Sequence, residues 1–319
     1  MSKMINYFVD TKYPENVSFA YNNFKDLRIS LFVNDCINEE IDEYLRNMMA
    51  ESLKKDLCIE VIHDSIDNSI KGIAFTDLSV GVLFERPFLS NSCSEKITEY
   101  FVSAGKIHDQ IEKIYIANTD FKKLDQINEN LIGELFKGES LNKKSKVVNR
   151  FFGAMTANKS VNYIENLTDE LNKRYFIKGR AGTGKSTFMK KVAKAAIERG
   201  YDVEKYHCSF APDSLDMVVM REIGVCIFDS TAPHEMFPSK ESDTIIDIFN
   251  ECVARGTEEK YEEEINYYQS MYNEMIHAGR EYLREFDDER KKYNKQNGRG
   301  LKIEEMDFVN NITKMIKSV

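Results

Sequence analysis

A nine-residue stretch at positions 179–187 is the feature that most constrains how this chain can fold. It consists of Gly179, Arg180, Ala181, Gly182, Thr183, Gly184, Lys185, Ser186 and Thr187. The stretch fits G-x-x-x-x-G-K-[ST], the phosphate-binding loop or Walker A motif. Its three glycines allow the backbone to turn N–H groups inward around an anion, in conformations that a Cβ would obstruct. The nine residues are therefore predicted to bind a nucleotide, with Lys185 on the β- and γ-phosphates and the Ser186 hydroxyl on Mg²⁺.

The residues on either side of this loop predict a strand before it and a helix after it. Residues 175–177 are Tyr-Phe-Ile, which is typical of a buried strand. After the loop, apolar residues recur every three or four positions from Phe188 to Ile197, and Gly200 marks a helix end. A helix that begins at the loop adds its N-terminal dipole to the anion site. The alternative is a glycine loop that merely connects a strand to a helix.

A second acidic group is expected at the end of a neighbouring apolar strand. Residues 225–228 are Val-Cys-Ile-Phe, and Asp229 follows them. Asp229 is predicted to be the Walker-B-type carboxylate that holds Mg²⁺ with Ser186 and acts in catalysis with Lys185. The alternative is an aspartate that caps the following turn. Ser230 stands where many motor-type ATPases have a glutamate, so the catalytic base is unassigned.

Polar residues after other predicted strands are further candidates for the same edge of the sheet. His207 ends the strand before Asp213 and Asp216, in a region that often holds the acceptor in small-molecule kinases. His234 and Glu235 follow the strand that ends at Asp229. Either could contact the γ-phosphate, a water or a second substrate, and the alternative is an ordinary loop histidine.

The order of predicted elements around the loop occurs twice in the chain, which indicates an internal duplication. Matched residues are 143 to 146 positions apart, so only small gaps are needed. The matched strands are 28–33 with 174–178, 58–63 with 202–207, and 81–84 with 224–228. His63 stands at the place of His207, which favours a packing role for His207. The alternative is a chance alignment of two α/β segments.

The first copy lacks the groups that would hold an anion. Alignment at Arg28 and Arg174 puts other residues at the loop glycines, namely Val33, Cys36 and Asn38. Glu39 and Glu40 replace Lys185 and Ser186, and Arg86, next to Glu85, replaces Asp229. Two carboxylates in place of an ammonium and a hydroxyl would repel a triphosphate. The first copy is therefore predicted to be structural or regulatory and to bind no nucleotide.

Each copy is predicted to end in helices. Apolar residues at helical steps run from Ile97 to Phe136 in the first copy and through segment 258–296 in the second. The second segment is rich in acidic residues, which favours a solvated helix face, and a helical hairpin or coiled-coil arm is a further interpretation. Residues 301–319 predict a final amphipathic helix, and the polar residues 137–146 join the two copies.

Composition limits the class of partner and the compartment. The 319 residues carry a net charge of −9 without a basic stripe, so no nucleic acid partner is expected. No signal peptide or membrane-spanning run is recognised, and no membrane partner is expected. The six scattered cysteines favour inert thiols in a reducing cytoplasm over a metal site. The expected location is cytoplasmic.

Three segments in combination resemble a bacterial family of tandem P-loop ATPases. They are GRAGTGKSTFMKKVAKAA at 179–196, YHCSFAPDSLDMVV at 206–219 and GVCIFDSTAPHE at 224–235, and the resemblance covers most of residues 148–295. Similar proteins often carry glycine-lysine loops in both halves, and this chain departs from that pattern at residues 33, 36 and 38–40. The resemblance implies ATP binding and names no substrate.

These observations predict an α/β chain of two tandem P-loop NTPase-like domains, each three-layered with a mostly parallel sheet and a helical appendage. The expected ranges are 1–140, without a Walker A motif, and 148–319, with the nucleotide site. The expected cofactors are ATP and Mg²⁺, and the expected activity is ATP hydrolysis. A kinase for a small acceptor and a nucleotide sensor with little turnover are the alternatives. The two halves are expected to form an intrachain pseudo-dimer, and any small-molecule or protein partner is unknown.

Overall fold

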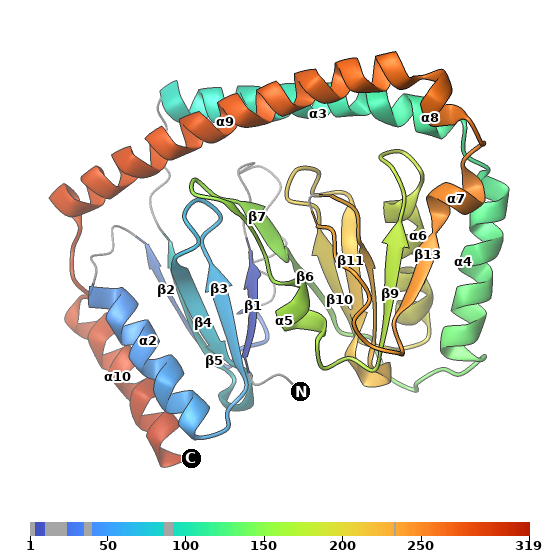
Figure 1. Cartoon of the computed structure of the whole chain (residues 1–319). Helices are drawn as coiled ribbons and strands as arrows, with labels where there is room; N and C mark the ends of the chain where they lie inside the picture. The colour runs from blue at the N-terminus through green and yellow to red at the C-terminus, as the bar shows by residue number, and fades with distance from the viewer. Residues whose placement is uncertain (1–3, 10–23, 35–39, 86–91, 233) are drawn as a thin grey trace. The chain divides into compact units, whose positions relative to one another are not determined.

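Short apolar strands alternate with amphipathic helices along the chain, and they form two compact units. The computed structural model describes residues 4–9, 24–34, 40–85, 92–232 and 234–319 (Figure 1). Unit 1 comprises Met1–Thr98, Phe151–Leu167 and Gly279–Val319, and unit 2 comprises Glu99–Arg150 and Thr168–Ala278. The units interleave along the chain, so their borders differ from the expected ranges 1–140 and 148–319.

Unit 1 contains a five-stranded sheet. Its strands lie in the order β1 (Met4–Phe8), β3 (Ile59–His63), β4 (Ile70–Phe75), β5 (Val80–Glu85) and β2 (Ile29–Asn34). Alternate strand residues point to one face, where they pack against α2 (Glu40–Lys54) and α10 (Ile303–Ser318). The helix expected at 301–319 is therefore part of the core of unit 1.

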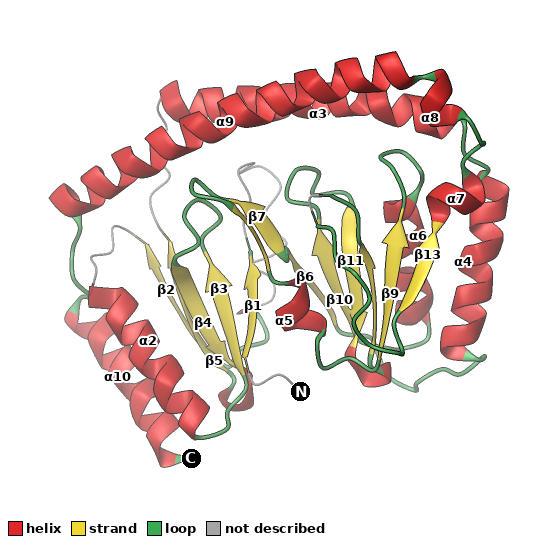
Figure 2. Cartoon of the chain, viewed as in Figure 1, coloured by secondary structure: helices red, strands yellow, loops and turns green. Residues whose placement is uncertain are grey.

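Unit 2 contains a six-stranded sheet. The order is β13 (Thr244–Asp247), β9 (Lys173–Lys178), β12 (Val225–Asp229), β11 (Leu215–Met220), β10 (Val203–His207) and β6 (Val147–Arg150). One face of this sheet packs against α6 (Lys185–Glu198), α4 (Phe121–Phe136) and α7 (Ile248–Cys252) in a continuous apolar cluster (Figure 2). The crossover helix α6 connects β9 to β10, as the sequence pattern predicted.

The two sheets share strand order and register. The order β2-β5-β4-β3-β1 in unit 1 corresponds to β9-β12-β11-β10-β6 in unit 2, and each pair has the same direction in both sheets. Phe75 lies opposite Val80 in unit 1, and Met220 lies opposite Val225 in unit 2. An irregularity falls immediately before His63 in one sheet and before His207 in the other. This agreement extends the sequence match from element order to individual residues.

Both sheets are mixed: four of the five strands in unit 1 and five of the six in unit 2 share one direction, which agrees with the prediction of mostly parallel sheets, and one strand in each runs the other way. The strands β4 and β11, which the sequence pattern did not reveal, run antiparallel to both of their neighbours. A single 3-10 turn follows each of them, at Thr76–Leu78 and at Arg221–Ile223. So short a connection can only reverse the chain, because a parallel neighbour requires a long crossover. The three-layer arrangement stays a prediction.

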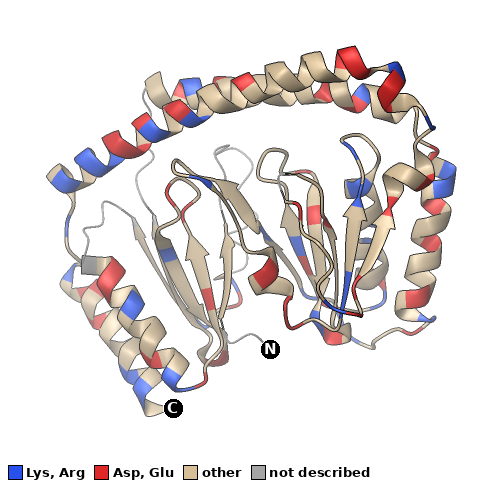
Figure 3. Ribbon diagram, in the orientation of Figure 1, with Lys and Arg blue, Asp and Glu red and all other residues tan. Residues whose placement is uncertain are grey.

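Two long helices contain two of the four places where the chain passes from one unit to the other. These are α3 (Ser92–Ala117) and α9 (Glu262–Asn297), with the short α8 (Thr257–Lys260) before α9. The helical sequence expected from 97 to 136 forms α3 and α4, and Asp120 begins α4 by accepting two backbone N–H groups. The charged residues in the first half of α9 are acidic, and acidic and basic residues are mixed in its second half (Figure 3). Within unit 2, the residues of α3 and α9 pack together through Tyr115 and Tyr268.

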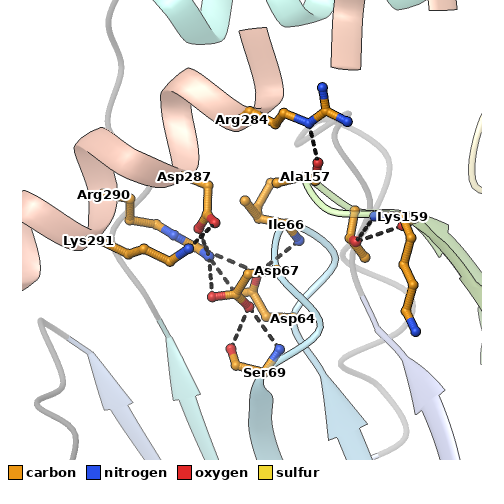
Figure 4. A network of polar contacts seen from close by, with 11 residues as sticks. Asp64, Ile66, Asp67, Ser69, Ala157, Lys159, Arg284, Asp287, Arg290 and Lys291 are labelled. Atoms are coloured by element: carbon orange, nitrogen blue, oxygen red, sulfur yellow. Dashed lines mark hydrogen bonds and ion pairs between the residues drawn. The ribbon is translucent and has the colours of Figure 1, made fainter. Parts of the chain in front are cut away.

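In unit 1, one arginine of α9 is buried among three carboxylates (Figure 4). Its Nη1 lies 3.1 Å from both carboxylate oxygens of Asp64, and its Nη2 lies 3.0 Å from Asp67 and 3.3 Å from Asp287. This residue, Arg290, is 3% exposed, and Lys291 donates to Asp287 at 2.6 Å. The network attaches α9 to the turn between β3 and β4.

The remaining segment of unit 1 follows β6 in the chain. It comprises β7 (Gly153–Met155), β8 (Ser160–Asn162) and α5 (Ile164–Thr168). Asn166 accepts the Asn6 backbone N–H at 2.8 Å, and the Tyr163 hydroxyl donates to Asn68 at 2.8 Å. Across the described ranges, no helix is both long and apolar enough to cross a bilayer. Within the same ranges, five of the six cysteines form no disulfide, and Cys36 lies outside them.

Candidate functional site

The glycine loop lies between β9 and α6 in unit 2, in the predicted strand–loop–helix setting. Gly182 has φ +78° and Gly184, the residue before α6, has φ +91°. L-residues with a Cβ rarely adopt this region, so both positions require glycine. The buried Thr183 hydroxyl donates to the Arg180 carbonyl at 2.8 Å and fastens the loop from within.

Lys185 extends over this loop instead of into solvent. Its Nζ donates to the carbonyl oxygens of Gly179 at 3.1 Å and Arg180 at 2.9 Å. The same nitrogen lies 3.5 Å from Asp229 Oδ2. The lysine that the motif predicts for phosphate and the aspartate predicted for magnesium therefore lie side by side.

Asp229 has the position that the sequence predicted, and it also caps a turn. It ends β12, directly beside Ile177 of β9. Its Oδ1 accepts the Thr231 backbone N–H at 3.0 Å and also the Thr231 hydroxyl, while its Oδ2 faces Lys185. The two interpretations made from sequence are compatible, because each uses a different carboxylate oxygen.

Asp216, which the sequence placed only in a candidate acceptor region of a kinase, lies at this site beside Asp229. Met217 pairs with Phe228 across β11 and β12, and Asp216 and Asp229 are the next residue on each strand. The neighbouring Leu215 N–H donates to Ser186 Oγ at 2.9 Å. Burial, followed by the charge of Asp229, raises the pKa of Asp216 to about 7. The apolar run that follows Asp216 was the signal that could have revealed its strand.

Both ring nitrogens of His207 are engaged by hydrogen bonds. Its Nδ1 lies 2.6 Å from the Pro212 carbonyl and its Nε2 lies 3.0 Å from Asn149 Oδ1. His63 has the same surroundings in unit 1, with the Asn68 carbonyl at 3.1 Å and Asn6 Oδ1 at 2.9 Å. Burial lowers the pKa of both rings. These contacts agree with the packing role that the sequence favoured.

The other candidates from sequence, His234, Glu235 and Asp213, lie at different places relative to Asp216 and Asp229. His234 Nε2 lies 4.0 Å from Asp216 Oδ2, which places it at the edge of the site. Glu235 instead faces Lys178, with Oε1 3.4 Å from Nζ. Asp213 is exposed in the loop that precedes β11.

Helices of unit 2 cover the outer side of the loop. A Cβ at Gly182 would lie 2.5 Å from the Glu112 carbonyl oxygen of α3, and one at Gly184 would lie 2.7 Å from Leu124 Cδ2 of α4. The Arg180 side chain donates to Glu258 at 2.7 Å. The Tyr115 hydroxyl also donates to Glu258, at 3.1 Å. The loop is therefore joined to both α3 and the start of α8.

Unit 1 has different residues at the positions of the two aspartates. Since Phe75 and Val80 correspond to Met220 and Val225, Lys71 takes the place of Asp216 and Phe84 that of Asp229. The sequence alignment had put Arg86 at the latter position, and Arg86 lies outside the described residues. The registers also match Val33 to Ile177 instead of Gly179, which corrects that pairing by two residues.

The remaining replacements predicted for the first loop fall on residues 36–40. Cys36, Asn38 and Glu39 lie outside the described residues, and Glu40 begins α2. The conclusion from sequence does not depend on them, because no glycine occurs between Arg28 and Lys71 in any alignment. A loop without glycine lacks the positive-φ positions found at Gly182 and Gly184.

The donor set of unit 2 fits magnesium and a triphosphate. Hydroxyl and carboxylate oxygens of Ser186, Asp216 and Asp229 are the ligand type that Mg²⁺ prefers, directly or through water. Lys185 and the first amides of α6 suit phosphate oxygens. Across the described ranges, this site included, no set of three or more His, Cys, Asp or Glu side chains is arranged to hold a metal ion, so the oxygen donors here are two carboxylates and a hydroxyl.

Comparison of the chain with family models, curated proteins and solved structures finds no match. The resemblance to tandem P-loop ATPases therefore stays a prediction from the motifs.

Proposed function

We propose that unit 2 binds Mg-ATP at residues 179–187 and hydrolyses it. The observation that carries this proposal is the position of Lys185. Its ammonium group lies over the glycine loop, bonded to two loop carbonyls and 3.5 Å from Asp229. A motif that occurred by chance would not also bring a carboxylate from a separate strand to the lysine.

The residues of the site would act by position and charge. Bound Mg-ATP supplies the transferable phosphoryl group and the divalent charge. The loop amides, the N-terminus of α6 and Lys185 would bind phosphate oxygens, while Ser186 and Asp229 would hold the metal. Because these groups are attached to β9, β12 and α6, they need little rearrangement to act together.

We also propose that the two units descend from one P-loop-type domain and that unit 1 has lost its nucleotide site. The shared registers and the matched His63 and His207 contacts support a common origin. The exchange of both aspartates for Lys71 and Phe84 supports the loss.

The proposal is tested by measuring ATP binding and the release of ADP and phosphate by the purified chain. Lys185→Ala is expected to abolish nucleotide binding, because it removes the cation nearest the phosphate site. Lys194→Ala is the matched control, since that lysine lies on the same helix with a 75% exposed side chain. ATP affinity that survives Lys185→Ala would contradict the site assignment.

The same assay separates the other two functions. Free phosphate without an acceptor supports hydrolysis. ADP that is formed only when a metabolite panel is added supports a small-molecule kinase. Binding without either product supports a nucleotide sensor. The contacts of Arg180 with Glu258 and of Gly182 with Glu112 would then connect the bound nucleotide to the helices.

A further inference from the structure

We propose that Asp216 is a second carboxylate that holds the magnesium ion, or its water shell, together with Asp229 and Ser186. This inference rests on the proposed function. It adds a residue from an antiparallel strand, β11, to a site that the sequence motifs build from the loop and β12 alone.

The first support is geometric. The registered pairs of β11 and β12 end at Met217 and Phe228, so Asp216 and Asp229 are the next residue on each of two adjacent strands, and the charge of Asp229 acts on Asp216. The residue before Asp216 is Leu215, and its backbone N–H donates to Ser186 Oγ at 2.9 Å. Asp216 is thus next to both groups that are expected to hold magnesium. It is 9% exposed, so its carboxylate belongs to the interior of the site.

The second support is the balance of charge. Lys185 is the cation 3.5 Å from Asp229, and its charge also acts on Asp216. When Lys185 turns to phosphate oxygens, two neighbouring buried carboxylates lose their shared counter-ion. Like charges so placed repel strongly unless a cation lies between or beside them. A divalent ion held by both carboxylates restores the balance.

The third support comes from unit 1, which has the same sheet without the acidic pair. Lys71 and Phe84 occupy the two positions there, and the strand registers are unchanged. The fold therefore does not require carboxylates at these places. Both are absent from the unit without a glycine loop and present in the unit that has one.

The test compares nucleotide binding with and without metal in Asp216→Asn. A fluorescent ATP analogue is titrated in EDTA and then in Mg²⁺, and Mn²⁺ binding in the presence of ADP is followed by electron paramagnetic resonance. Asp216→Asn is expected to match the wild type in EDTA but to bind Mn²⁺ about 10-fold or more weakly. Asp213→Asn, an exposed aspartate in the preceding loop, is expected to change neither.

The alternatives give different results. Unchanged Mn²⁺ affinity in Asp216→Asn would overturn the inference while leaving ATP binding intact, and lost turnover with that affinity unchanged would assign Asp216 to proton transfer. If the wild-type chain binds the analogue neither with nor without metal, the proposed function itself fails. Asp216→Glu keeps the carboxylate, so partial recovery of Mn²⁺ binding relative to Asp216→Asn is expected, and no recovery counts against the inference.

Discussion

The charged forms of two buried aspartate side chains in unit 2, Asp243 and Asp216, are stabilised to very different degrees. Arg174 donates to Asp243 through Nε at 2.8 Å and Nη2 at 2.6 Å, and this lowers the pKa of Asp243. Asp216 lies beside another carboxylate, and burial raises its pKa to about 7. The first is a satisfied structural ion pair. The second is a carboxylate whose charge is unfavourable until something binds, which is typical of functional sites.

Asp216→Asn is therefore expected to stabilise the chain without ligands. The unfolded carboxyl ionises near its reference pKa of 3.8 and the folded one near 7, so the folded state holds the proton longer and loses stability as pH rises between these values. Asparagine removes this loss. Urea unfolding without nucleotide or metal should show a larger gain at about pH 8 than at about pH 5. An equal gain at both values would contradict the raised pKa.

At the scale of elements, the glycine loop joins α6 to the helices that cover it. Gly182 is restricted twice, by its positive φ and by the Glu112 backbone of α3. Arg180 and Tyr115 meet at Glu258, which begins the chain segment leading into α9. Any movement of the loop on ligand binding would therefore change its contacts with α3 and α8.

A pair of glycine substitutions tests this close approach. Gly182→Ala is expected to destabilise the chain by about 1–3 kcal/mol, because it adds backbone strain and a contact with Glu112. Gly133→Ala is the control, since a Cβ added at this exposed glycine of α4 would meet no atom within 4 Å, and helix propensity predicts a gain of about 0.5–1 kcal/mol. Denaturant unfolding measures both. A neutral Gly182→Ala would indicate that α3 does not press on the loop.

At the scale of the whole molecule, the two units share one strand order and differ in the residues at the strand ends near the glycine loop. Both sheets place a histidine and an asparagine in the same contact, yet only unit 2 has the glycine loop, Asp216 and Asp229. The shared positions maintain the sheet, and the positions that differ are those proposed to bind nucleotide and metal.

Titration with Mg-ATP is accordingly expected to saturate at about one equivalent per chain. Calorimetry on the intact chain gives this number directly. Lys71→Asp, which restores an acid to unit 1, should not create a second site, because the chain there still lacks the glycine loop. Two equivalents for the wild-type chain would contradict the proposed loss of the first site.

Several elements could be predicted because their signals are local. The strands around the loop, helix α6 and the helix after residue 300 follow from apolar periodicity and from glycine. The strands β4 and β11 were missed, because short apolar runs between turns carry no period of their own. The acidic residues of segment 258–296 are mostly exposed as expected, but Asp287 is buried, since only the fold brings Arg290 and Asp64 to it.

The sequence by itself determined the glycine loop, the lysine and serine that follow it, and the strand that ends at Asp229. These depend on neighbours within a few residues, where backbone conformation and side-chain spacing are decided. Only the tertiary structure decided that Asp216 lies beside Asp229, that Val33 corresponds to Ile177, and that segments 151–167 and 279–319 belong to unit 1. The physical reason is that strand register and segment packing are set by contacts between residues distant in the chain, which no local pattern records.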